Sequence, residues 1–236
     1  MADYDSWGGQ MAWRPFIMFF HPPDLRTASC NTDSLGFRFS ADPSGSVART
    51  DQWQDRSCNL LLGNSVAFSV GATSDAASLS ARMSHYSGKT WLNFSGRAFA
   101  ASQEYLTFIF YRHRIGPHKR VVLFSGSNDL YLYYAPKKMF DETFGIFFFS
   151  DVFAERMNPQ PPPELPHWSK QMWQSVFRRR IKPAGGKPAN TEQLPNLDEV
   201  IAERRLTREK AVTLLARSLE NWKIAADGLG LDLLYA

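Results

Sequence analysis

From residue 58 onward, short apolar runs alternate with longer segments that have the spacing of amphipathic helices. The apolar runs predict strands at four places: Cys58–Gly63, Thr90–Phe94, Arg120–Gly126 and Leu231–Ala236. Between the second and third of these runs, a crossover helix is predicted over Ser102–Gly116, with four inward positions at helical spacing: Leu106, Ile109, Phe110 and His113. Strands that alternate with helices are typical of βαβ units. The pattern therefore predicts an α/β fold with a parallel sheet between two layers of helices.

The strongest helical pattern lies late in the chain, between a capping Thr207 and a terminating Gly228 or Gly230. Its apolar stripe is Val212, Leu215, Ala216, Leu219 and Trp222. The connection that precedes it contains "NPQPPPELPHW" and "KPAGGKPAN", which are too rich in Pro and Gly for a continuous element. We therefore expect an N-terminal extension at 1–57 that packs on a domain at 58–236, with an insertion at about 130–206 after the third strand.

Composition agrees with a globular protein, because 44% of the 236 residues are hydrophobic and 14% are aromatic. The net charge of +4 comes largely from the run at Arg178–Lys187, for which a solvated loop or helix end is favoured over a phosphate-binding role. Nucleic acid is therefore an unlikely partner on charge alone.

Cysteine usage and the apolar runs favour a cytoplasmic protein. Cys30 and Cys58 lie far apart, which favours neither a disulfide framework nor a paired-cysteine zinc site. The start, "MADYDSWGGQ", lacks the basic and apolar regions of a signal peptide. The apolar runs "FIMFF" and "FGIFFFSDVF" are shorter than the roughly 20 residues that span a bilayer, so we expect no membrane partner.

Small polar residues follow each of the first three predicted strands. In a parallel α/β sheet the functional site lies beyond the carboxyl ends of the strands, where Ser65, Gly96 and Asn128 are expected to meet. Acyl transfer needs a hydroxyl that attacks a carbonyl and donors aimed at the resulting oxyanion. We predict Ser65 as the nucleophile, with the N–H groups of Ser65 and Gly96 and the Asn128 amide as those donors. The structural alternative is that all three residues only form turns.

The segments "LLLGNSVAFSVGA", "NFSGRAF" and "LFSGSND" resemble the first three sequence blocks of the SGNH (GDSL-like) hydrolase family, and "NTDSLGFRFS" resembles a stretch that precedes them in many bacterial members. This resemblance implies a flavodoxin-like α/β/α fold. It also implies a serine nucleophile at Ser65 and an oxyanion hole completed by Gly96 and Asn128. The substrate it implies is a small ester or acyl compound.

Two departures from the family pattern affect the expected chemistry. Asn64 stands where the family usually has Asp, and we expect it to support the turn rather than react. The family's last block, an Asp and a His two residues apart, has no match, so we expect that part of the triad to lie beyond Ala236 in a longer protein. Of the five histidines, only His167, in the insertion, is placed where it can swing over Ser65. Without a base, a serine hydroxyl is a poor nucleophile.

Other catalytic and cofactor motifs are missing from the sequence. The Gly-x-Ser-x-Gly pattern fails because Ala67 occupies its last position, and neither a phosphate-binding loop nor a dinucleotide fingerprint is present, so we expect no cofactor or metal. Two functions stay open: an ester hydrolase, and a non-catalytic SGNH-like binding or regulatory protein linked to bacterial secondary metabolism. A last strand at 231–236 would leave an exposed sheet edge, which favours a homo-oligomer.

Overall fold

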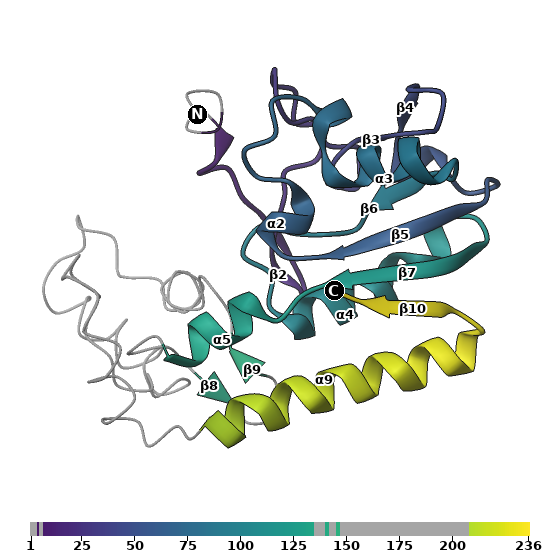
Figure 1. The fold of residues 1–236 in the computed structure, drawn as a ribbon. Helices are drawn as coiled ribbons and strands as arrows, with labels where there is room; N and C mark the ends of the chain where they lie inside the picture. The colour runs from purple at the N-terminus through teal and green to yellow at the C-terminus, as the bar shows by residue number, and fades with distance from the viewer. Residues whose placement is uncertain (1–3, 5–6, 135–139, 142–144, 147–207) are drawn as a thin grey trace, which may run out of the picture.

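Four parallel strands form the central sheet, in the order β10-β7-β5-β6 (Figure 1). The computed structural model describes residue 4 and residues 7–134, 140–141, 145–146 and 208–236. Within these residues the strands are β5 (Cys58–Gly63), β6 (Trp91–Asn93), β7 (His118–Phe124) and β10 (Asp232–Tyr235). All four lie where the apolar runs predicted strands. The parallel sheet and the α/β class are therefore confirmed.

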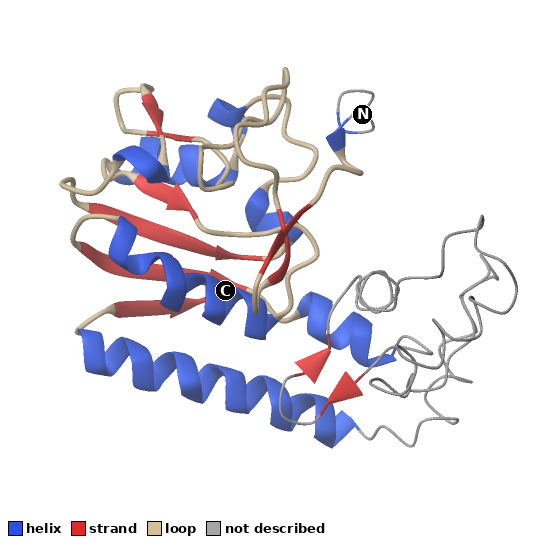
Figure 2. Ribbon diagram, turned by 180° about the vertical axis from the view of Figure 1, so that it is seen from behind, coloured by secondary structure: helices blue, strands red, loops and turns tan. Residues whose placement is uncertain are grey.

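Helices α4 (Ala101–Tyr111) and α9 (Arg208–Leu229) lie side by side along one face of the sheet (Figure 2). They meet at Trp222, whose ring centroid lies 5.3 Å from that of Tyr105 and 5.2 Å from that of Phe108. Helix α3 (Leu79–Ser87) packs against β6. The crossovers into β6 and into β7 run in opposite directions along the sheet, so right-handed connections place α3 and α4 on opposite faces.

The strand order reverses between β5 and β7. The chain leaves β5 toward β6 on one side, whereas it leaves β7 toward β10 on the other. The loops that follow β5 and β7 therefore diverge, and such a reversal is where ligands bind in open parallel sheets. Ser65 and Asn128 follow these two strands.

The N-terminal region contributes to the same hydrophobic core as the sheet. It contains an antiparallel pair, β1 (Ala12–Arg14) with β2 (Met18–Phe20), and a second pair, β3 (Ser40–Ala41) with β4 (Val47–Ala48). Several of its apolar side chains pack in one cluster with those of β5: Ile17, Phe19, Phe20, Phe37 and Trp53. The Ser40 hydroxyl donates to the Trp91 carbonyl at 2.7 Å and so covers the β6 edge of the sheet.

Helix α4 confirms the predicted crossover helix, but most of the side chains predicted to face the core do not. Its buried residues are Ala101, Gln103, Glu104, Thr107 and Phe108. Ile109 and Phe110 are exposed, and His113 lies exposed in a short 3₁₀ turn at Arg112–Arg114 that follows the helix. Of the four predicted inward positions, Leu106 is partly buried and packs against the core. The prediction was wrong for the other three because apolarity alone set the face, whereas the fold buries the polar Gln103, Glu104 and Thr107 side chains.

Most of the predicted insertion lies outside the described residues. Helix α5 (Ser127–Tyr134) and a two-stranded pair, β8 (Phe140–Asp141) with β9 (Gly145–Ile146), are the elements that the structure describes after β7 and before α9. The basic run at 178–187 and His167 also lie outside them. Two further 3₁₀ turns lie at Thr50–Gln52 and Asp75–Ala77.

Candidate functional site

Ser65 is the first residue of a one-turn helix, α2 (Ser65–Phe68), that begins directly after the central strand β5. The turn between them is tight. Gly63 has a φ of +148°, and a Cβ there would overlap the Phe124 carbonyl of β7, so only glycine fits. The Asn64 side chain accepts from the Val66 N–H at 3.0 Å and thereby caps the helix. This confirms the expected structural role of Asn64.

Ser65 is half-buried, and its hydroxyl makes no hydrogen bond to any residue that the structure describes. Its backbone N–H is at the start of α2, where N–H groups have no acceptor within the helix. A free hydroxyl beside a free N–H is the pairing that a nucleophile with its own oxyanion donor requires.

A side-chain hydrogen bond joins the loop after β5 to the loop after β7. The Asn64 amide donates to the Ser127 hydroxyl at 2.7 Å, so the cap of α2 is also fixed to the first residue of α5. Sequence reasoning did not find this contact, since nothing in the spacing of residues 64 and 127 predicts it. An aspartate at residue 64 would lack the N–H that makes this bond.

Gly96 lies in the loop after β6, where it packs beneath an aromatic ring. A Cβ at Gly96 would overlap the ring of Phe99, and Ala98 between them has a left-handed φ of 58°. The Gly96 N–H donates to the Gly63 carbonyl at 3.0 Å. In this conformation that N–H is therefore engaged within the protein, and its predicted role in an oxyanion hole requires the loop to rearrange.

Asn128 lies in the first turn of α5, and its amide donates to the Phe99 carbonyl at 2.8 Å. One amide N–H is left for another acceptor. Phe99 thus contacts both Gly96 and Asn128, and Asn64 links Ser65 to α5 through Ser127. The three predicted residues belong to one connected set of loops at the carboxyl edge of the sheet. Their catalytic roles stay a prediction.

His21 is the described histidine with contacts to these loops. Its ring stacks on Phe68 of α2 with centroids 4.2 Å apart, and its Nε2 accepts from the Arg97 N–H at 3.0 Å. Burial lowers the pKa of His21 well below its ordinary value, and the positive charge of Arg97 lowers it further. The ring is therefore neutral, with the Nε2 lone pair occupied, so in this state it does not serve as a base for Ser65.

The other described histidines lie away from Ser65. His118 begins β7 at the opposite edge of the sheet, as expected, and burial lowers its pKa. His85, in the last turn of α3, and His113 are exposed. The base that Ser65 needs is therefore not provided by a described histidine in this conformation.

Two carboxyl groups lie near the end of β7, the buried Glu104 and the half-buried Asp129, and the sequence did not predict the raised pKa of either. Glu104 is fully buried, and neither of its oxygens has a hydrogen-bond partner among the described residues. Burial raises the pKa of Glu104 well above its ordinary value, and the charge of Asp129 raises it further. Burial also raises the pKa of Asp129 to about 6. Asp129 accepts from the Ala101 N–H at 3.0 Å and so caps α4.

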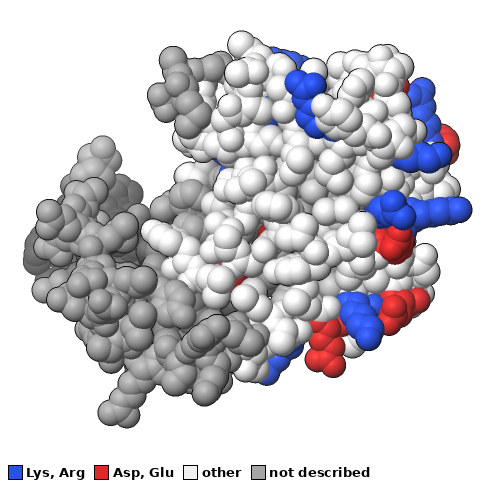
Figure 3. Space-filling model, in the orientation of Figure 1, with Lys and Arg blue, Asp and Glu red and all other residues white. Residues whose placement is uncertain are grey.

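On the face in Figure 3, the described residues near the carboxyl ends of the strands show few charged side chains. On the face in Figure 3, Lys, Arg, Asp and Glu gather over the opposite ends of the strands, where Arg120 pairs with Asp232 at 2.6 Å. Within the described residues, no group of three or more His, Cys, Asp or Glu side chains is arranged to hold a metal ion. Nor do those residues include a helix with the length and apolarity to cross a membrane.

No protein-family model matches the chain, and no curated protein sequence matches it. The function is therefore inferred from the geometry of the carboxyl edge.

Proposed function

We propose that the protein is a serine hydrolase of the SGNH (GDSL-like) type that cleaves an ester or similar acyl bond, with Ser65 as the nucleophile. The observation that carries this proposal is the placement of Ser65. Ser65 begins a one-turn helix directly after strand β5, next to the reversal in strand order. The residue is half-buried, and its hydroxyl is not hydrogen-bonded to any described residue.

In this mechanism the Ser65 Oγ attacks the acyl carbonyl carbon, and its proton passes to a general base. The carbonyl oxygen becomes an oxyanion that accepts from the Ser65 N–H and from the free N–H of the Asn128 amide. Collapse of this intermediate breaks the ester bond, the leaving alcohol takes the proton from the base, and water then releases the acid from the Ser65 acyl ester. The Gly96 N–H can donate to the oxyanion only after its hydrogen bond to the Gly63 carbonyl is broken. The base is a histidine with an acidic partner. Within the printed sequence, His167 is the one histidine that lies outside the described residues, so turnover by this chain alone requires His167 as the base.

On the face in Figure 3, the described residues at this edge show few charged side chains, which supports a neutral acyl substrate over an anionic one. The described residues of this edge give no support to binding of nucleic acid, which depends on neutralising phosphate charges with basic side chains, and the basic run at 178–187 lies outside them.

Hydrolysis of a series of p-nitrophenyl esters with acyl chains of increasing length tests the proposal. We expect measurable turnover by the wild-type chain and a loss of at least about 10³-fold in kcat for Ser65→Ala. Ser46→Ala is the matched control, since Ser46 is an exposed turn serine that contacts Ser44 and Asp42. Equal turnover by Ser65→Ala and wild type would contradict the assignment of Ser65.

A second function is favoured by a specific observation, the engagement of the predicted donors within the protein. The Gly96 N–H is bonded to Gly63 and the Asn128 amide to Phe99. A non-catalytic SGNH-like module that binds a small acyl ligand, in a regulatory role, needs no free oxyanion hole. Calorimetric binding of a non-cleavable ester analogue, together with no turnover of any ester in the series, would favour this second function.

A further inference from the structure

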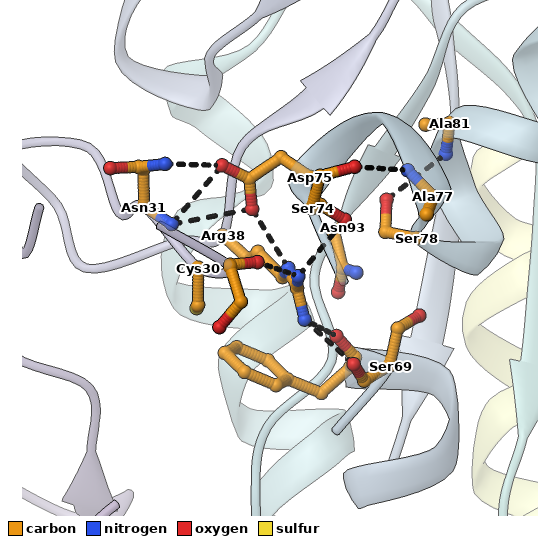
Figure 4. Close-up of polar contacts among 12 residues, drawn as sticks. Cys30, Asn31, Arg38, Ser69, Ser74, Asp75, Ala77, Ser78, Ala81 and Asn93 are labelled. Atoms are coloured by element: carbon orange, nitrogen blue, oxygen red, sulfur yellow. Dashed lines mark hydrogen bonds and ion pairs between the residues drawn. The ribbon is translucent and has the colours of Figure 1, made fainter. Parts of the chain in front are cut away.

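Arg38 is a buried cation whose guanidinium makes five hydrogen bonds, drawn in Figure 4. Its Nε donates to the Asp75 carboxylate at 3.0 Å. Its two terminal nitrogens donate to four backbone carbonyls: Phe68 at 3.1 Å, Ser69 at 2.7 Å, Ser29 at 2.6 Å and Ser74 at 3.4 Å. The Arg38 side chain is 1% exposed. Burying a charge so completely is tolerated only where it is paired and hydrogen-bonded, as it is here.

Two of these acceptors are the last carbonyls of the helix that carries Ser65. Phe68 ends α2, and Ser69 follows it with a left-handed φ of 69°. An isolated four-residue helix is unstable in water, because closing the first turn fixes several residues for very few hydrogen bonds. The last carbonyls of a helix carry partial negative charge, so a cation placed there stabilises it. Arg38 is such a cation.

Asp75 keeps Arg38 in place and is itself held by a second residue. The Asn31 N–H and side-chain amide donate to the Asp75 carboxylate, the amide at 2.7 Å. Asn31, Arg38 and Asp75 thus form a connected network at the C-terminal end of α2 (Figure 4). At the other end of the helix, Asn64 caps the Val66 N–H and is fixed to Ser127. The helix is therefore held at both ends: at its C-terminal end by Arg38, and at its N-terminal end by the adjacent Asn64, which is bonded to Ser127.

We propose that Arg38 is a positioning residue for Ser65, which holds the C-terminal end of α2 so that the serine at its N-terminal end keeps its orientation. This inference rests on the proposed function for its catalytic meaning. The claim that Arg38 stabilises α2 does not depend on whether the protein is an enzyme. The nucleophile would thus depend on a residue from the N-terminal region that does not touch the substrate.

Three backbone amides report directly on α2. The Phe68 N–H donates to the Asn64 carbonyl at 2.9 Å, the Ser69 N–H to Val66 at 2.9 Å and the Val70 N–H to Ser65 at 3.0 Å. Their hydrogen exchange, measured by NMR, follows the opening of this helix alone. The amides within the central strand β7 report on the rest of the sheet.

The test compares Arg38→Lys, which keeps the charge but loses the planar fork, with Asp75→Asn, which keeps the shape but loses the ion pair. The control is Arg49→Lys, because Arg49 also pairs with an aspartate, Asp51 at 2.7 Å, but makes no hydrogen bond to the described residues of α2. We expect exchange at Phe68, Ser69 and Val70 to accelerate by about tenfold or more in both variants, since charge-assisted hydrogen bonds are lost. We expect unchanged exchange in β7 and in the control.

Labelling of Ser65 by a fluorophosphonate is measured on the same samples. We expect its rate to fall by about tenfold or more in the two variants, and methylguanidinium to restore it in part in Arg38→Ala, where the cation can refill the vacated site. Rescue would show that a guanidinium at this site, rather than the intact Arg38 side chain, is what the labelling of Ser65 depends on.

The outcomes separate the two proposals. Unchanged exchange at α2 in folded Asp75→Asn, or equal acceleration in α2 and β7, would overturn the positioning role whatever the labelling shows. If Arg38→Lys does not fold, Asp75→Asn decides. Faster exchange confined to α2 in a chain whose wild type is not labelled would leave the structural part standing and refute the proposed function.

Discussion

Gly96 is the residue at which the structure makes the sharpest stability prediction. A methyl group there would overlap the Phe99 ring, which is fully buried and joins the loop after β6 to the core. We expect Gly96→Ala to lower the free energy of unfolding by about 1–3 kcal/mol, the range for overpacking in a filled interior.

Urea unfolding monitored by tryptophan fluorescence measures this loss. Gly9→Ala is the matched control, because a Cβ there meets no atom within 4 Å, and we expect a change within about 0.5 kcal/mol. Equal midpoints for the two variants would show that the Gly96 loop moves aside, which would also favour release of the Gly96 N–H toward an oxyanion.

The burial of Glu104 leads us to expect that the free energy of unfolding decreases as the pH rises. Because burial raises its pKa in the folded state, the folded chain binds a proton that the unfolded chain has already lost above about pH 4.3. The contribution of Glu104 to stability is therefore fully present at low pH and decreases as the pH rises toward its folded pKa. Asp129, with its pKa raised to about 6, acts in the same direction.

We expect Glu104→Gln to raise the melting temperature at pH 8 more than at pH 5, because glutamine keeps the shape and cannot ionise. Thermal unfolding at pH 5, 6.5 and 8 measures the effect, with Glu220→Gln on the exposed face of α9 as the control. A variant that is less stable than wild type by the same amount at all three pH values would show that Glu104 is ionised and paired in the native protein.

At the scale of elements, the contact between α2 and α5 should be measurable as a coupling energy. Asn64→Ala removes both the helix cap and the bond to Ser127, and we expect it to cost about 1–2 kcal/mol. Ser127→Ala removes only the bond between the loops. A double-mutant cycle over the two positions should give a coupling of about 0.5–1 kcal/mol. Additive losses would show that the two loops are energetically independent.

The elements also show what the sequence could predict. The strands were predicted correctly because a short apolar run such as Cys58–Gly63 is typical of a strand buried on both faces of a parallel sheet. The start of α4 was displaced by one residue, from Ser102 to Ala101, because its cap is Asp129 from α5, a contact made across the fold. For the same reason, the environments of Arg38 and His21 were not predicted from the sequence. Their partners are distant in sequence, and no local pattern indicates them.

At the scale of the whole molecule, the exposed edge strand β10 is a place where two copies of the chain could pair. Among the described residues β10 pairs only with β7, and its Leu234 and Tyr235 side chains are 47% and 48% exposed. An edge strand with unpaired backbone groups can pair with a second copy. We expect concentration-dependent dimers of this chain in light scattering, reduced in Leu234→Lys. A monomer at every concentration would contradict this expectation.

The proposed chemistry of the whole protein requires Ser65 to be an activated nucleophile, and covalent labelling tests this most directly. The full chain is treated with a fluorophosphonate, and the modified residue is identified by mass spectrometry in wild type, Ser65→Ala and Ser46→Ala. We predict one adduct, on Ser65, present in wild type and Ser46→Ala and absent from Ser65→Ala. No adduct on the folded wild-type chain, or an adduct that persists in Ser65→Ala, would contradict the proposed role of Ser65.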